Sequence, residues 1–182
     1  MKICTIDTFF EALDLLDKKL KTINRKIEIR AIGGFAMLYY GFREKGYTID
    51  IDSLTEAYDE SVIGLIQETG RELSIDPDWL NTDCAELEGF LGDLSEKITW
   101  KAIDKGLECI NLKIADIKGL IRSKAKAIHE GGLVPRSTDK KDLLTGLSKV
   151  GIHNVSDLGK EYDFIREEYK RCYDFLIEQK KW

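Results

Sequence analysis

The sequence predicts an α+β protein, in which a small mixed β-sheet is flanked by helices and followed by a helical C-terminal part. Two observations predict this class. Alternating apolar and polar residues, typical of strands, are confined to a few short runs within residues 26–114. Apolar residues at three- and four-residue spacing, typical of helices, separate those runs and follow them. We expect a core of residues 1–114 and a helical part of residues 115–182 packed on it as one compact unit.

Composition narrows the classes of function before any motif is considered. The chain has 182 residues, of which 43% are hydrophobic and 34% are charged, and its formal net charge is −5. It is long enough to bury a core, and it lacks the overall basic field that attracts long nucleic acids. No apolar run approaches the roughly 20 residues that span a bilayer, and the N-terminus lacks the apolar segment of a signal peptide. We therefore expect a cytoplasmic protein with no membrane association.

The cysteines and histidines predict neither disulfides nor a zinc centre. Four cysteines are scattered without a CxxC pair, a pattern typical of reduced core thiols. His129 and His153 do not lie at ligand spacing from a cysteine or from each other.

The N-terminal half is expected to begin with a helix, a strand and a glycine pair. Asp7 is the expected cap of the first helix, and Gly33-Gly34 ends the first strand. The elements expected here are a helix at residues 7–23, a strand at 26–32, a short helix at 35–40 and a loop at 41–46.

Further strands and helices follow in the same way. A strand is expected at residues 47–54, and a hairpin pairs residues 98–103 with 107–114 around a turn that contains Gly106. Asp59 is the expected cap of the next helix, and Gly131-Gly132 breaks a later one. The helices are expected at residues 60–72, 82–94, 116–129 and 137–150.

A long helix is expected from Ser156 to the C-terminus. Its apolar residues follow a 4-3-4-3-4 spacing: Leu158, Tyr162, Ile165, Tyr169, Cys172 and Leu176. This spacing suits either a coiled coil, and hence a dimer, or an amphipathic helix packed on its own domain. We favour the second interpretation.

The most informative feature is the pair Asp50 and Asp52. Residues two apart on a strand point to the same face, so both carboxylates are expected to project together. Because close carboxylates repel each other, a divalent cation is the usual reason to build such a pair. The alternative is a solvated strand edge whose negative charge discourages aggregation.

The pair Gly33-Gly34 favours the first alternative, a cation-binding site. A glycine pair after a strand allows a ligand to approach the backbone closely, although it also suits a tight strand-to-helix turn. A glycine turn together with two carboxylates on the next strand predicts a site for phosphate and metal.

Lys124 and the residues after Arg136 supply a second candidate cluster. Lys124 falls within an apolar helical stripe, so its ammonium group must either snorkel to the surface or point into a polar cleft that holds an anion. Asp139 and Asp142 lie three residues apart and suit the first turns of a helix. They are equally placed to fix Lys124, to bind a metal or to act as a base.

Two segments of the chain resemble the DNA polymerase β-like nucleotidyltransferase superfamily. The first contains Gly33-Gly34, then Tyr40-Gly41-Phe42-Arg43, then Thr48-Ile49-Asp50-Ile51-Asp52. The second contains Lys124 within a Lys-x-x-Ala element, followed by Arg136, Asp139 and Asp142 in an Arg-x-x-Asp-x-x-Asp element. This order resembles the nucleotidyltransferase toxins of type IV toxin–antitoxin (abortive infection) systems and their uncharacterised relatives.

The resemblance implies a sheet of the nucleotidyltransferase type and a Mg²⁺-dependent reaction. Asp50 and Asp52 would bind Mg²⁺, and Gly33 and Gly34 would hold the phosphates of a nucleoside triphosphate. Thr48 would support the aspartate strand.

The resemblance also assigns roles to basic and acidic residues elsewhere. Arg43, Lys124 and Arg136 would contact the nucleotide. Asp142, together with Asp139, would orient Lys124 or act on the incoming hydroxyl. A third carboxylate is often present in the superfamily, and Glu108 is the best candidate here, ahead of Asp104.

The expected activity is transfer of a nucleoside monophosphate to a hydroxyl of RNA, such as tRNA, or of a protein. A toxin of this kind would also have a cognate antitoxin as its partner. The alternative is a module without catalysis that keeps the fold and binds a nucleotide or a partner protein.

Overall fold

The structure confirms the predicted α+β class. The computed structural model describes residues 4–43, 48–87, 89–131 and 136–179. The chain divides into two compact units, Met1–Asp116 and Ile117–Trp182. The first unit contains a five-stranded mixed sheet with flanking helices, and the second is helical.

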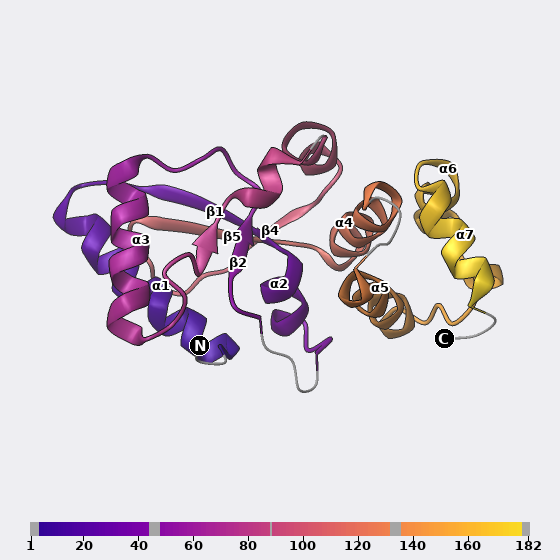
Figure 1. The fold of residues 1–182 in the computed structure, drawn as a ribbon, viewed down its shortest axis with the longest axis horizontal. Helices are drawn as coiled ribbons and strands as arrows, with labels where there is room; N and C mark the ends of the chain where they lie inside the picture. Colours follow the sequence, from indigo (N-terminus) through magenta and orange to yellow (C-terminus); the bar gives the residue numbers. More distant parts are fainter. Residues whose placement is uncertain (1–3, 44–47, 88, 132–135, 180–182) are drawn as a thin grey trace. The chain divides into compact units, whose positions relative to one another are not determined.

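The sheet of the first unit has the strand order β3-β2-β1-β5-β4. Strands β1, β2, β4 and β5 are labelled in Figure 1. Its strands are β1 (Ile27–Ile32), β2 (Ile51–Ser53), β3 (Leu80–Asn81), β4 (Trp100–Ala102) and β5 (Ile110–Ala115). The helical segments of this unit are α1 (Ile6–Thr22), α2 (Gly33–Tyr39), α3 (Glu60–Leu73), the 3₁₀ turn η1 (Asp83–Glu86) and the π-helical turn η2 (Phe90–Leu94).

The central strand β1 determines which residues can meet at each end of the sheet. It pairs with β5 in parallel and with β2 in antiparallel orientation. Ile32 aligns with Asp52, so the carboxyl end of β1, where Gly33 follows, lies beside the aspartate segment. Ile27 aligns with Ile110, so the residues just before β5 lie at the opposite end of the sheet.

Aromatic rings fix the helices that follow and precede the glycine pair. Phe9 of α1 meets Phe35 of α2 edge to face, with ring centroids 5.6 Å apart, and lies 6.5 Å from the ring of Trp79. All three side chains are fully buried, and burial of each contributes about 2–3 kcal/mol. Because Phe35 directly follows Gly34, this cluster holds the start of α2 against the core.

Two helix starts show how the local sequence determines the boundaries. α1 begins one residue earlier than expected, because the Thr5 hydroxyl accepts the backbone N–H of Thr8 at 3.3 Å. Asp7 lies in the first turn, so its prediction as the cap is wrong. The prediction for α3 is confirmed, since Asp59 accepts the N–H of Val62 at 3.1 Å.

Two parts of the first unit, strand β2 and the segment before β4, differ from the prediction. Of the strand expected at residues 47–54, the described part is a strand only at Ile51–Ser53, and Asp50 directly precedes it. The helix expected at 82–94 is replaced by η1 and η2, with Gly89 in the left-handed region at a φ of 67°. A residue at positive φ interrupts a right-handed helix, which explains the break. The hairpin of β4 and β5 is confirmed.

The second unit contains two longer helices and several short ones. They are α4 (Ile117–Glu130), α5 (Ser137–Lys149), the 3₁₀ turns η3 (Val155–Asp157) and η4 (Lys160–Tyr162), α6 (Phe164–Glu167) and α7 (Lys170–Glu178). Residues 44–46 of the expected loop, Tyr47 of the expected strand and Gly132 of the expected helix break lie outside the described residues.

The single C-terminal helix expected from Ser156 is wrong. The chain leaves helical geometry at Leu158 and Gly159 and again at Tyr169. At the start of this segment the side chains of Asn154 and Asp157 bind backbone N–H groups, which competes with helix formation. The six apolar residues at 4-3 spacing are nevertheless all buried in the core of this unit. The stripe that suited a coiled coil is therefore covered by the unit itself.

In the part of the chain that the structure describes, no helix combines the length and the apolar character needed to cross a membrane.

Candidate functional site

The structure places the two predicted aspartates at strand β2, on one face of the sheet. Asp52 is the middle residue of β2, and both carboxylates are half-buried. Asn81 on β3 aligns with Asp52, yet its amide nitrogen lies 3.4 Å from Asp50 Oδ2. Aligned residues of neighbouring strands share a face, so Asp50, Asp52 and Asn81 project from the same side.

Gly33 and Gly34 lie in direct contact with this aspartate segment. Gly33 adopts a φ of 64°, and a Cβ atom there would lie 2.2 Å from Asp52 Oδ2. A Cβ atom at Gly34 would lie 2.3 Å from Thr48 Oγ1 and 3.1 Å from Arg43 Nη1. The glycine pair therefore provides the space in which Asp52, Thr48 and Arg43 approach the start of α2.

Asp50 is held by two neutral donors. The Thr48 hydroxyl donates to Oδ1 at 3.1 Å, and Asn81 Nδ2 faces Oδ2 at 3.4 Å. Because neither donor carries a charge, these bonds orient the carboxylate without neutralising it. We name the group of Gly33, Gly34, Arg43, Thr48, Asp50, Asp52 and Asn81 the aspartate site.

Sequence reasoning missed two residues here, Asn81 and Cys84. Asn81 belongs to a strand of two residues, which is too short to produce an alternating pattern. The Cys84 thiol donates to the Ser53 carbonyl at 3.5 Å. Burial raises the pKa of this thiol, and the negative charges of Asp52 and Asp50 raise it further. Cys84 therefore stays protonated and is not a nucleophile at neutral pH.

The structure does not bring Glu108 to the aspartate site. Glu108 precedes β5 at the end of the sheet opposite Asp52, and its exposed carboxylate forms an ion pair with Lys21 at 2.7 Å. Its assignment as a third metal-binding carboxylate is corrected accordingly. Asp104 accepts the N–H of Gly106 within the hairpin turn, as a turn residue does.

The side chains of the aspartate site suit Mg²⁺ better than a metal ion that is held entirely by protein ligands. Within the described ranges, no group of three His, Cys, Asp or Glu side chains is placed to hold a metal ion. Mg²⁺ is commonly bound through one or two carboxylates, while water and substrate phosphates complete its shell. Asp50 and Asp52 fit that requirement.

Lys124 belongs to a charged cluster inside the second unit. Its ammonium group lies 2.7 Å from Asp139 Oδ1 and 3.1 Å from Asp142 Oδ2, and all three side chains are largely buried. Arg136 lies 3.7 Å from the other oxygen of Asp139. Of the predicted roles for the two aspartates, the one visible in this unit is fixing Lys124.

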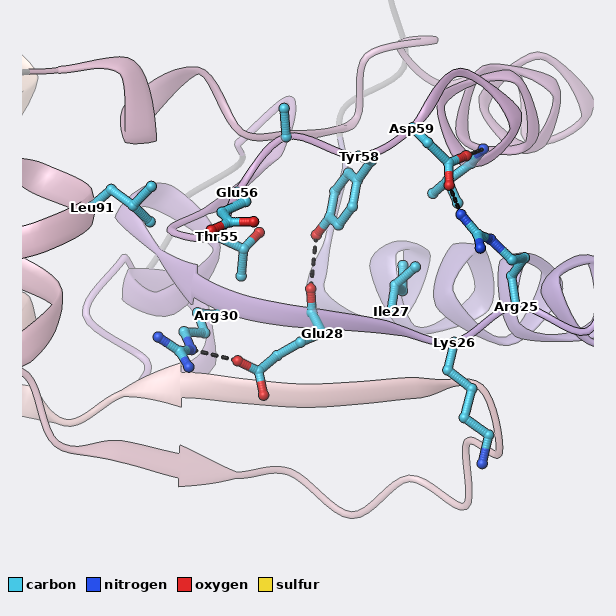
Figure 2. Close-up of a pocket in the computed structure, with 12 residues that line it drawn as sticks. Arg25, Lys26, Ile27, Glu28, Arg30, Thr55, Glu56, Tyr58, Asp59 and Leu91 are labelled. Carbon is cyan, nitrogen blue, oxygen red and sulfur yellow. Dashed lines mark hydrogen bonds and ion pairs between the residues drawn. The ribbon is translucent and has the colours of Figure 1, made fainter.

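A separate pocket of about 460 Å³ lies along β1, on the edge where β2 has ended (Figure 2). Tyr58 covers it and donates to the Glu28 carbonyl at 3.0 Å. Its charged groups are largely paired: Arg25 with Asp59, and Arg30 with Glu28 (Figure 2). This balance does not favour a triphosphate, whose binding requires an excess of positive charge.

No protein-family model matches the sequence, and neither a curated protein nor a solved structure matches the chain.

Proposed function

We propose that the protein is a Mg²⁺-dependent nucleotidyltransferase. It would transfer a nucleoside monophosphate from a nucleoside triphosphate to a hydroxyl of RNA or protein, with release of pyrophosphate. The observation that carries this proposal is the pair of aspartates: Asp52 lies against Gly33, and Asp50, two residues earlier in the chain, has both carboxylate oxygens oriented by neutral donors. A carboxylate held in place with its charge intact is suited to a cation.

Each residue of the aspartate site has a role in this proposal. Asp50 and Asp52 would hold Mg²⁺, which supplies positive charge to the phosphate oxygens when it is bound. Arg43, beside Gly34, would bind and orient the triphosphate through its guanidinium group. Thr48 would keep the Asp50 carboxylate in its orientation.

One observation favours the alternative of a nucleotide-binding module without transfer. Among the described residues, the aspartate site lacks a third acidic side chain that would strengthen metal binding. The two proposals agree on a nucleotide site and differ only in turnover.

Thermal melts test the nucleotide site shared by both proposals. We expect Mg²⁺ and a nucleoside triphosphate together to raise the melting temperature more than either alone, since ligand binding stabilises the folded state by mass action. The Asp50→Ala/Asp52→Ala protein should lose this shift. Asp14→Ala is the matched control, because Asp14 forms an exposed ion pair with Lys18 outside the site. An equal shift in the double variant would contradict the site.

Label transfer then separates the enzyme from the binding module. The protein is incubated with each α-labelled triphosphate, Mg²⁺ and either total RNA or total protein. Transfer to an acceptor that requires Asp50 and Asp52 supports the enzyme and identifies the acceptor class. Co-operative stabilisation without transfer to either pool supports the binding module.

A further inference from the structure

We propose that Asn81 is a positioning residue that sets the metal affinity of the aspartate site. The inference rests on the proposed function, because it concerns how the same site holds its cation. It assigns two properties to Asn81: its amide orients Asp50, and its neutrality keeps the number of carboxylates at two.

The orientation of the Asn81 side chain follows from its other contacts. The backbone N–H of Asp83 donates to Asn81 Oδ1 at 3.1 Å, so the amide oxygen is already used. The amide nitrogen is therefore the atom that faces Asp50 Oδ2 at 3.4 Å, and it also lies 3.5 Å from the Asp78 carbonyl. The loop that follows β3 thus fixes which end of the amide meets the carboxylate.

Asn81 and Thr48 hold Asp50 from two sides. Thr48 donates to Oδ1, and Asn81 approaches Oδ2 from the neighbouring strand. Groups that bind a metal-holding carboxylate fix its rotamer before the metal arrives, so their loss weakens metal binding. Asn81 also aligns with Asp52, which places residue 81 beside both carboxylates.

Asn81→Asp would keep nearly the same side-chain shape, but it should raise the metal affinity that Asn81→Ala lowers. It would replace the amide donor with a third carboxylate on the same face. Without a cation, three close carboxylates repel one another. With a divalent cation, the added negative charge increases affinity, since the charge of the ligand set tunes metal binding.

Binding of Mn²⁺, used as a spectroscopic probe for the Mg²⁺ site, tests this inference by electron paramagnetic resonance without any assay of turnover. We expect Asn81→Ala to bind Mn²⁺ about tenfold more weakly than the unmodified protein. Asn81→Asp should bind about tenfold more tightly, and should melt at a lower temperature when no metal is present. Opposite changes in affinity at one position cannot arise from a general loss of folding.

Asn111→Asp is a matched control. Asn111 on β5 donates to Glu28 Oε2 at 2.9 Å, so this variant also places a new carboxylate beside an existing one. Its partner Glu28 lies about 13 Å along β1 from the residue that aligns with Asp52. Its Mn²⁺ affinity should equal that of the unmodified protein.

The outcomes distinguish failure of the inference from failure of the proposed function. If Asp50→Asn abolishes Mn²⁺ binding but both Asn81 variants bind as the unmodified protein does, the role of Asn81 is overturned and the metal site stands. If binding survives in Asp50→Asn, or is absent from the unmodified protein, the metal site of the proposed function is overturned, and the role of Asn81 falls with it. Equal tightening by Asn111→Asp would show a nonspecific effect of charge and would also overturn the inference.

Discussion

Asp50 of the aspartate site and the two carboxylates of the Lys124 cluster are held in opposite ways. In the second unit, Asp139 and Asp142 contact the ammonium group of Lys124 at 2.7 and 3.1 Å, so their negative charge is met by a cation of the protein itself. In the first unit, Asp50 is bound by a hydroxyl and an amide, which leave its charge in place.

The difference indicates what each cluster needs in order to be stable. A buried ion pair is complete without a ligand, and removing one partner is costly because a charge is left without compensation. A carboxylate held by neutral donors is oriented but not neutralised, so binding of an external cation stabilises its ionised form. Measurements of stability without ligand can therefore separate a structural cluster from a binding site.

The same substitution in the two clusters gives the largest expected contrast. Asp142→Asn leaves Lys124 with one carboxylate partner in a buried setting and should lower the free energy of unfolding by about 2–3 kcal/mol. Asp50→Asn removes one of two neighbouring carboxylates and should cost nothing measurable in the absence of metal. Urea denaturation of both variants at neutral pH, without divalent cations, provides the comparison.

Lys124→Met with Asp139→Asn and Asp142→Asn is the control for the first half of this contrast. Replacing all three charges together avoids an unpaired buried ion, so the triple variant should be more stable than Asp142→Asn alone. A large loss of stability in Asp50→Asn would show that the aspartate site, too, is structural.

The sequence predicted most elements whose signals are local. The Asp59 cap, the strand before Gly33 and the hairpin around Gly106 were all expected and are present. The C-terminal segment shows the limit of such patterns: its 4-3 spacing correctly identified six buried residues, but several short helices place them in the core instead of one long helix. Spacing reports which residues are buried and does not by itself report the backbone between them.

The aspartate site was predictable only where its residues are close in sequence. Thr48, Asp50 and Asp52 form one segment, and Gly33-Gly34 forms another. Asn81 reaches Asp50 through pairing of β2 with β3, a contact that no local pattern encodes. Glu108 was misplaced because its strand register and direction put it at the far end of the sheet.

A substitution of glycine sharpens the comparison by testing how tightly the aspartate site is packed. Gly34→Ala places a Cβ atom 2.3 Å from Thr48 Oγ1 and 2.7 Å from Thr48 Cβ, and should cost about 2 kcal/mol through overpacking. Gly64 also lies in a helix, but a Cβ atom there meets nothing within 4 Å. Gly64→Ala should therefore stabilise the protein by roughly 0.5–1 kcal/mol.

Urea denaturation measures both glycine variants, and Mn²⁺ binding adds a second readout. Displacement of Thr48 in Gly34→Ala should weaken the hold on Asp50 and lower the affinity for the cation, whereas Gly64→Ala should bind as the unmodified protein does. Equal stability changes at the two positions would show that the space beside Gly34 is not confined.

The smallest expected effect concerns Glu28, a paired carboxylate within the first unit that serves as a reference for Asp50. Burial alone would raise the pKa of Glu28, but its hydrogen bonds and ion pairs with Lys113 and Arg30 outweigh burial and lower it. Because the folded-state pKa is below the ordinary value, the ionised form contributes stability above that value. This contribution is lost as the pH falls through the folded-state pKa.

Glu28→Gln should therefore lower the free energy of unfolding by less than about 1 kcal/mol at pH 7, since the Glu28 side chain is partly exposed. The difference from the unmodified protein should shrink as the pH falls, because protonation removes the same charge from Glu28. Urea denaturation between pH 7 and pH 3 measures this convergence. The Asp50 carboxylate has no cationic partner among the described residues. Asp50→Asn should therefore have the same stability as the unmodified protein at pH 7, and lowering the pH should reveal no convergence. Parallel curves for the two variants would mean that pairing with a cation does not distinguish Glu28 from Asp50, and the contrast between Asp50 and the paired carboxylates would fail.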